Sequence, residues 1–221
     1  MKELRILYHD SSLVVCVKPP ELLSQESEKE QNVPHALKDL LNETYVGTVH
    51  RLDKAVGGVM VYSLNEKITG KLSACLADKE KTVKEYLAVL NGVPRQPDGI
   101  LRDWLFHDER TNKTYVIKKQ RKGARDASLE YKTLQVRDGR TLVLVRLHTG
   151  RTHQIRVQFA SRGLPLCGDG RYGGGKGQIA LWSYRLSFIH PVTGKTLEFL
   201  SEPDENIFKE TWNYDSVPPV K

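Results

Sequence analysis

Residues 148–163 read HTGRTHQIRVQFASRG, and this is the most sharply delimited pattern in the chain. Ile155 and Phe159 lie four residues apart, the spacing of one helical face. Thr152 suits an N-cap and Gly163 suits a C-terminal stop, so the pattern predicts a helix between them. Because strand-like segments precede and follow this helix, we expect an α+β protein.

Patterns elsewhere predict most of the other elements. Runs of strand-forming residues indicate strands, and stretches with one apolar face indicate helices. The expected strands are 6–8, 13–17, 59–63, 84–90, 113–118, 127–136, 141–148, 179–188 and 196–200, with an extended stretch at 46–50 and helices at about 34–43 and 66–77. We therefore expect a largely antiparallel or mixed, curved sheet flanked by helices and loops.

Size and composition indicate a globular chain. Its 221 residues can bury a sizeable core, and 39% hydrophobic with 28% charged residues argues against a mostly disordered protein. Neither a secretory signal nor a bilayer-crossing apolar run is present, so we expect a cytoplasmic protein without a membrane partner. Cys16, Cys75 and Cys167 lie far apart without C-x-x-C spacing, which predicts thiols rather than a zinc site or disulfides.

The charge is positive and unevenly distributed. A net charge of +7 and a pI of about 9.2 suit a polyanionic partner such as nucleic acid, without being diagnostic of one. Residues 113–125 (KTYVIKKQRKGAR) hold six cations and no acid, among them Lys118, Lys119 and Arg121, whereas residues 201–216 are acidic. Taken alone, the basic run is better explained as a solvated hairpin or loop.

Polar clusters stand out from apolar surroundings at 50–53 (HRLD), 84–86 (KEY) and 149–156 (TGRTHQIR). If the first cluster is extended, Arg51 and Asp53 share a face, although an isolated R-x-D is better explained as a surface strand end. Arg156 falls between two apolar residues of the expected helix, where an unpaired cation is costly. Arg156 therefore needs a partner, which sequence spacing does not identify.

These clusters closely resemble the hallmarks of the RluA-type family of RNA pseudouridine synthases. That family has an H-R-L-D block and a downstream G-R-T-H-Q-I-R-V block, which stand here at 50–53 and 150–157. The further similar segments are 14–19, 84–89, 163–169 and 186–191. The resemblance thus covers roughly 5–200 and predicts one catalytic domain over 1–221, with 201–221 as a C-terminal extension and no S4-type RNA-binding module.

The chain departs from the family pattern at two dipeptides. Val56-Gly57 stands where the family often has Thr-Ser, and Trp182-Ser183 stands where it often has His-Ala. These departures bear on substrate details and leave the class of enzyme unchanged.

The resemblance implies isomerisation of uridine in ribosomal or transfer RNA, without metal or organic cofactor. Asp53 would be the nucleophile, because a carboxylate can attack the sugar, or support an elimination, and then leave again. Arg156 would pair with Asp53 and favour its ionised form. Tyr86 would stack its ring on the base.

The resemblance also implies that the target base is flipped out of its stack. Arg51 would occupy the gap that the base leaves, and Leu181 would line the apolar side of the pocket. Arg151 and the basic run 113–125 would contact phosphates, a sequence-independent contribution that weakens as salt rises. RNA is the expected partner, and a monomer is the default expectation.

Two other functions and a metal site fit these residues less well. A noncatalytic RNA-binding or RNA-remodelling protein on the same fold has no evident need for the set Asp53, Tyr86 and Arg156. A nucleoside glycosidase would release uracil, which mass balance detects. His50, His148 and His153 lack H-x-x-x-H helix spacing, so hydrogen-bonding histidines are preferred to a metal site with Asp53.

Overall fold

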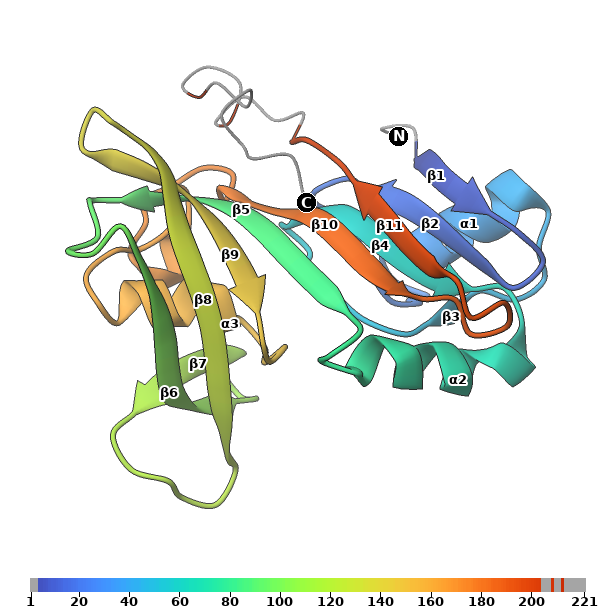
Figure 1. The fold of residues 1–221 in the computed structure, drawn as a ribbon, viewed down its shortest axis with the longest axis horizontal. Helices are drawn as coiled ribbons and strands as arrows, with labels where there is room; N and C mark the ends of the chain where they lie inside the picture. Colours follow the sequence, from blue (N-terminus) through green and yellow to red (C-terminus); the bar gives the residue numbers. More distant parts are fainter. Residues whose placement is uncertain (1–3, 204–207, 209–211, 213–221) are drawn as a thin grey trace. The chain divides into compact units, whose positions relative to one another are not determined.

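The chain divides into two compact units, shown in Figure 1. The structure, a computed structural model, describes residues 4–203, 208 and 212. Unit 1 comprises Met1–Lys84 and Trp182–Pro203, and unit 2 comprises Glu85–Leu181 and Asp204–Lys221. Each unit has its own strands and its own hydrophobic core. The acidic segment 201–216 and the expected C-terminal extension lie mostly outside the described residues.

Unit 1 contains a mixed sheet in the order β1-β2-β4-β10-β11, and β3 also pairs with β4. Its neighbouring strands are antiparallel except for β4 and β10, which run parallel. The bounds are β1 Arg5–His9, β2 Leu13–Lys18, β3 Gly47–Thr48, β4 Gly57–Ser63, β10 Leu181–Ile189 and β11 Thr196–Leu200.

Both faces of this sheet are covered, since β2 and β4 are buried along their whole length. On one face, Leu72 and Leu76 of helix α2 (Glu66–Ala77) belong to a core cluster that also contains Val61 and Phe188. On the other face, the hydroxyl of Tyr62 donates a 2.9 Å hydrogen bond to the carbonyl of Ser24. The loop that follows β2 therefore packs against the sheet.

Asparagines begin the two helices of unit 1. The side chain of Asn32 accepts from the N–H of His35 at the start of α1 (Val33–Leu41), and Asn65 caps α2 by accepting from the N–H of Lys67. Asn42 ends α1 in the left-handed conformation, with φ of 54°. These caps explain why both helices stand where their sequence patterns predict them.

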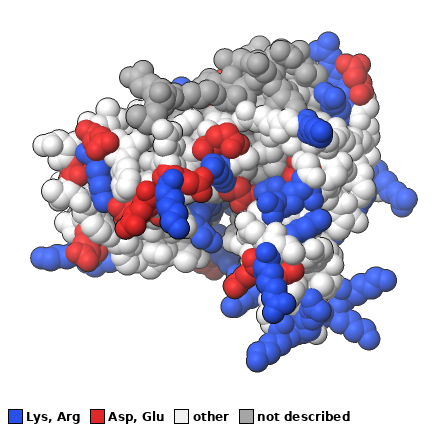
Figure 2. All heavy atoms as spheres, turned by 180° about the vertical axis from the view of Figure 1, so that it is seen from behind, with Lys and Arg blue, Asp and Glu red and all other residues white. Residues whose placement is uncertain are grey.

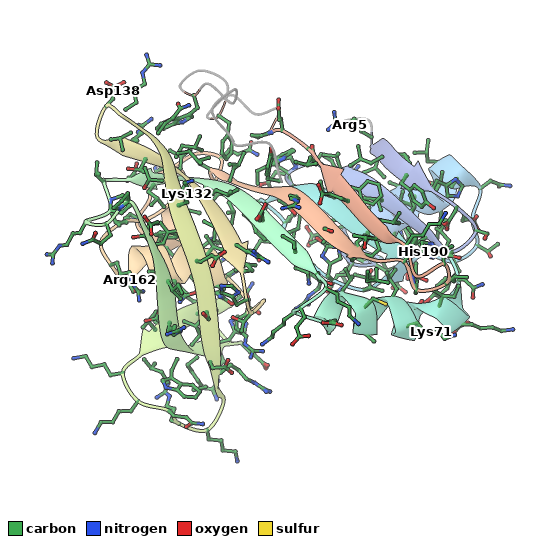
Figure 3. The ribbon with its side chains drawn as sticks, in the orientation of Figure 1. Arg5, Lys71, Lys132, Asp138, Arg162 and His190 are labelled. Carbon is green, nitrogen blue, oxygen red and sulfur yellow. The ribbon has the colours of Figure 1, made fainter. Side chains whose placement is uncertain are left out.

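A buried histidine joins two turns of unit 1, and Figure 3 labels it at the end of β10. His190 Nδ1 accepts hydrogen bonds from the N–H groups of Val192 and Thr193, so the ring proton sits on Nε2. Nε2 then donates to the carboxylate of Asp10 over 2.9 Å. This bond ties the β10–β11 turn to the β1–β2 turn.

Unit 2 contains an antiparallel sheet in the order β5-β9-β8-β6-β7. Helix α3 (Gln154–Ala160) packs on it, with Val157 in a cluster with Leu105 and Ala127, while the rings of Phe159 and Tyr131 meet edge to face at 5.4 Å. The bounds are β5 Val83–Asn91, β6 Asp98–Asp108, β7 Lys113–Ile117, β8 Ala124–Arg137, β9 Arg140–Leu147 and the 3₁₀ helix η1 Gly170–Tyr172.

The predicted α+β class and its largely antiparallel, mixed sheet are confirmed. Strand β6 was not predicted, and within the expected extended stretch at 46–50 only Gly47–Thr48 pairs as a strand. The expectation that Thr152 is an N-cap is wrong. His153 holds the cap position instead, with φ of 55° and no side-chain cap bond. Among the residues that the structure describes, no helix is long and apolar enough to cross a membrane.

Candidate active site

Asp53 lies in an irregular segment between β3 and β4 whose main chain is held on both sides. The buried hydroxyl of Ser24 donates to the carbonyl of Leu52 over 2.7 Å and accepts from the N–H of Leu52 over 3.1 Å. The carbonyl of Asp53 accepts from the N–H of Val56 at 2.9 Å, which closes a turn. The half-buried Asp53 side chain is thus presented from a fixed backbone.

Lys18 holds the next peptide of this segment. Its fully buried side chain donates from Nζ to the carbonyls of Lys54 and Pro19, each over 2.9 Å. Burial lowers the pKa of Lys18 to about 7, while the negative charges of Glu21 and Asp53 act in the opposite direction. A buried amine that becomes an ammonium near neutral pH therefore lies within electrostatic reach of Asp53.

His50 is a structural hydrogen-bond acceptor in the same segment. Its Nε2 accepts from the N–H of Val61 over 3.0 Å. Burial lowers the pKa of His50 to about 3, and the positive charge of Lys84 adds to this effect. The imidazole is therefore neutral at physiological pH, with its proton on Nδ1. Lys84 donates from Nζ to the carbonyl of Leu76 at the end of α2, over 3.2 Å.

Arg51 points away from this anchored backbone and is exposed. Its Nη1 donates a 3.0 Å hydrogen bond to the side-chain oxygen of Gln25. Because Gln25 is uncharged, it does not offset the positive charge of Arg51, which faces solvent. The predicted role of Arg51 in base flipping stays a prediction.

In unit 2, Arg156 is buried in α3 and paired with Asp169. Arg156 Nε and Nη2 donate to the two carboxylate oxygens of Asp169, each over 2.8 Å, and the Asp169 side chain is 1% exposed. The guanidinium carbon also lies 5.1 Å from the ring centroid of Tyr172. This bidentate contact fixes the plane of the guanidinium. Asp169 is a partner that the sequence reasoning missed.

Tyr172 connects Arg156 to strand β7. Its hydroxyl accepts from the N–H of Thr114 over 2.8 Å and lies 2.9 Å from Nδ1 of His153. Burial raises the pKa of Tyr172, so the hydroxyl keeps its proton at neutral pH. The start of α3, η1 and β7 are thereby joined through one phenol.

The other predicted residues of unit 2 occupy different environments. Tyr86 in β5 is 7% exposed and Leu181 at the start of β10 is 6% exposed, so both are nearly buried. Arg151 donates from Nε to the carbonyl of Asp126 over 2.9 Å and from Nη2 to its carboxylate over 3.2 Å. A phosphate at Arg151 would therefore compete with Asp126.

The cations of the basic run lie at the surface. Lys118, Lys119 and Arg121 are exposed in the connection between β7 and β8. Figure 2 shows blue side chains crowded at the lower end of the view, where this connection lies.

The predicted residues divide between the two units: Arg51 and Asp53 belong to unit 1, and the others belong to unit 2. The structure adds Lys18 and Ser24 in unit 1 and Asp169 in unit 2. Lys18 had a visible signal, because it closes the otherwise apolar strand segment LVVCVK. No spacing rule marks Ser24 or Asp169.

The two departures from the family pattern meet in unit 1. Gly57 of β4 pairs with Trp182 of β10, and a Cβ added to Gly57 would lie 2.3 Å from the indole ring. Trp182 is buried and donates from Nε1 to the carbonyl of Ser201 over 2.7 Å. The glycine therefore makes room for the tryptophan, and the two departures form one packing feature.

Comparisons with known proteins give a consistent result. A family model described as RNA pseudouridylate synthase matches residues 12–161. An uncharacterized RNA pseudouridine synthase of Aquifex aeolicus (strain VF5) is 31% identical over 96% of this chain and 72% of its own length. An uncharacterized RNA pseudouridine synthase of Bacillus subtilis (strain 168) is 34% identical over 89% of this chain and 71% of its own length.

Solved structures share the fold. Human RNA Pseudouridylate Synthase Domain Containing 1 superposes with a TM-score of 0.74 and 21% identity, over 91% of this chain and 84% of that chain. Human RNA Pseudouridylate Synthase Domain Containing 4 gives the same TM-score over 90% of this chain. Together with the family match and the relatives, this resemblance means that the chain belongs to the RNA pseudouridylate synthase family, as an isomerase that converts uridine in RNA to pseudouridine.

Proposed function

We propose that Asp53 is the nucleophile of this pseudouridine synthase and that its substrate is ribosomal or transfer RNA. The observation that carries the assignment of Asp53 is its anchored backbone. Ser24 satisfies both backbone groups of Leu52, and Lys18 holds the carbonyl of Lys54. A carboxylate presented from a fixed main chain suits a reaction in which the attacking atom must be held in line with the sugar.

The reaction is an isomerisation, so it leaves the atomic composition of the RNA unchanged. The N1–C1′ bond of uridine breaks, the base turns, and a C5–C1′ bond forms; C5 loses a proton and N1 gains one. Asp53 either attacks the sugar or supports an elimination, and it leaves when the carbon–carbon bond forms. Both routes need an ionised carboxylate at Asp53.

Tyr86 and Arg156 serve the same reaction in this proposal. The ring of Tyr86 stacks on the base, and the pairing of Arg156 with Asp53 stays part of the proposal. Asp169 and Tyr172 support Arg156 by fixing its guanidinium within unit 2. Arg51 fills the gap left by the flipped base, and Leu181 lines the apolar side of the pocket.

The remaining parts of the proposal concern the whole chain. Residues 1–221 work as one catalytic domain, as a monomer, in the cytoplasm. The three cysteines, Cys16, Cys75 and Cys167, are free thiols, which supports a reducing compartment. Arg151 and the basic run supply phosphate contacts.

The test is pseudouridine mapping on total RNA by carbodiimide modification and reverse transcription. Cells lacking the protein are complemented with wild type, with Asp53→Asn or with the surface control Asp39→Asn. We expect at least one site to disappear on deletion and to return with wild type and Asp39→Asn, but not with Asp53→Asn. Substantial turnover by Asp53→Asn would show that Asp53 is not the nucleophile.

The same samples separate the alternatives. Loss of free-base mass from the RNA would indicate glycosidase activity, because isomerisation leaves the mass unchanged. No change at any uridine, with RNA binding retained, would favour a noncatalytic RNA-binding protein.

A further inference from the structure

Strand β6 has a second face, turned away from α3. Leu105 packs in the core cluster beneath α3, so strand alternation directs Trp104 and Phe106 to the opposite side. Both rings are only half-buried. Tyr115 of β7 lies opposite Phe106 in the strand register and is 42% exposed. Aromatic rings of two adjacent strands therefore share what we call the outer face: Trp104, Phe106 and Tyr115.

A cation already lies over one of these rings, since the guanidinium carbon of Arg121 is 4.1 Å from the ring centroid of Phe106. Nζ of Lys113 lies at the edge of the face, 5.6 Å from the ring centroid of Tyr115 and 5.5 Å from that of Tyr172. Lys118 and Lys119 are exposed in the same β7–β8 connection, which is part of the blue region in Figure 2. Exposed rings interleaved with cations match what single-stranded nucleic acid presents, since bases stack on rings and phosphates attract cations.

Two acids beside this face are engaged in other contacts. Asp126 lies opposite Trp104 in the register, but its carboxylate pairs with Arg151. Asp108 accepts from the N–H of Arg110 and the hydroxyl of Thr111 within its own turn. The basic run itself contains no acid. The local field is therefore positive, which favours a polyanionic partner.

We propose that the outer face binds an unpaired stretch of the RNA substrate, with bases stacking on Tyr115 and Arg121 while Lys118 and Lys119 contact phosphates. This inference rests on RNA being the substrate, and it adds the class of RNA: a loop or single strand. A continuous duplex hides its base faces within the stack, so it can offer this surface only its phosphates.

The experiment measures binding of a single-stranded oligonucleotide of adenosine and cytidine that carries one 2-aminopurine. The probe contains no uridine, so the result does not depend on catalysis or on the assignment of Asp53. We expect Tyr115→Leu to weaken binding about tenfold and to reduce quenching of 2-aminopurine, whereas Tyr115→Phe stays within about twofold. Arg121→Lys, which keeps the charge and loses the planar group, should also reduce quenching.

A matched pair of lysine variants tests the electrostatic part. Lys118→Ala/Lys119→Ala should weaken binding and flatten its salt dependence, by a slope of about 0.7 for each lost phosphate contact. Lys71→Ala/Lys79→Ala should leave both unchanged, because Lys71 extends from α2 in unit 1, as Figure 3 shows, and Lys79 follows the same helix.

Three outcomes would overturn the proposal. Equal binding by Tyr115→Leu and Tyr115→Phe would show that bases do not stack on Tyr115. Equal effects of the two lysine pairs would show that the RNA does not bind at the outer face. Equal affinity for the probe annealed to its complementary DNA strand, which contains no uridine, would show that the face has no preference for unpaired RNA. Circular dichroism of each variant establishes that the exposed substitutions leave the fold intact.

Discussion

At the scale of single residues, the buried carboxylate of Asp169 holds Arg156, which is a catalytic residue in the proposed mechanism. It contacts Arg156 through both oxygens and is almost fully buried. Arg156 can aim at a substrate or at another carboxylate only in the plane that Asp169 sets. Asp169 is therefore a positioning residue in the proposed mechanism.

We expect Asp169→Asn to lower kcat about 10- to 100-fold, because the guanidinium loses its second charged contact and its fixed orientation. KM for the RNA should change little, since Asp169 is buried beneath Arg156. Steady-state kinetics below the thermal midpoint of the variant measure this split. Asp126→Asn, which alters the exposed pair with Arg151, is the control and should keep kcat within about twofold. A folded Asp169→Asn enzyme with wild-type kcat would contradict the role.

At the scale of elements, the parallel pairing of β4 with β10 brings one small residue opposite one large residue. Gly57 leaves the space that the indole of Trp182 fills, and a Cβ there would collide with the ring. Strand β4 begins directly after the turn that follows Asp53, so the fit also fixes where that turn ends.

Gly57→Ser should lower the free energy of unfolding by about 1–3 kcal/mol, because the added atoms overpack the site. Trp182→His alone should lower it by about 3 kcal/mol, because it leaves a cavity and loses the bond to the carbonyl of Ser201. The loss of unfolding free energy in the double variant should be smaller than the sum of the losses in the two single variants, by about 1 kcal/mol or more. Urea denaturation of all four proteins measures the coupling, and strict additivity would show that the two positions do not interact.

Elements with local signals were predictable and those without them were not. The sequence predicts α2 with the bounds that the structure shows, since an apolar face defines it. Strand β6 was not predicted because Arg102 and Asp103 interrupt its apolar alternation. Asp103 finds its partners, Gln158 and Arg162, far along the chain. The helix at 154–160 was predicted, but its start was placed at Thr152, since no local pattern marks a left-handed histidine as a cap.

The site followed the same division. Asp53 and Arg156 could be named because they stand in contiguous blocks that resemble a family. Ser24 could not, because its bonds to Leu52 join residues 28 positions apart. The contact of Asp169 with Arg156 likewise depends on the fold of the loop that follows α3.

At the scale of the whole molecule, acid should destabilise the protein through His50. The folded pKa of His50 is lowered to about 3, whereas an unfolded chain has the ordinary value of 6.5. Below pH 6.5 the His50 imidazole binds a proton in the unfolded state, whereas in the folded state it stays neutral until about pH 3. The contribution of neutral His50 to the free energy of unfolding is therefore fully present above pH 6.5 and is lost as the pH falls toward 3.

The expected loss over this window is up to about 4 kcal/mol of unfolding free energy. His50→Gln keeps a side-chain acceptor and does not titrate, so its stability should fall less steeply between pH 6.5 and 3. His9→Gln, at an exposed position, should follow the wild-type curve. Urea denaturation at several pH values checks this, and parallel curves for His50→Gln and wild type would exclude His50 as the source.

The anchoring of the Asp53 segment has a consequence for exchange with solvent. The N–H of Leu52 is bonded to a buried hydroxyl and that of Val56 to the carbonyl of Asp53, although neither residue lies in a helix or strand. An amide exchanges deuterium only when its bond opens, and these bonds share their anchors with the core strands β2 and β4. The irregular stretch that carries Asp53 should then retain its amide protons as long as the sheet beside it, so in the proposed reaction the RNA moves while this stretch stays in place.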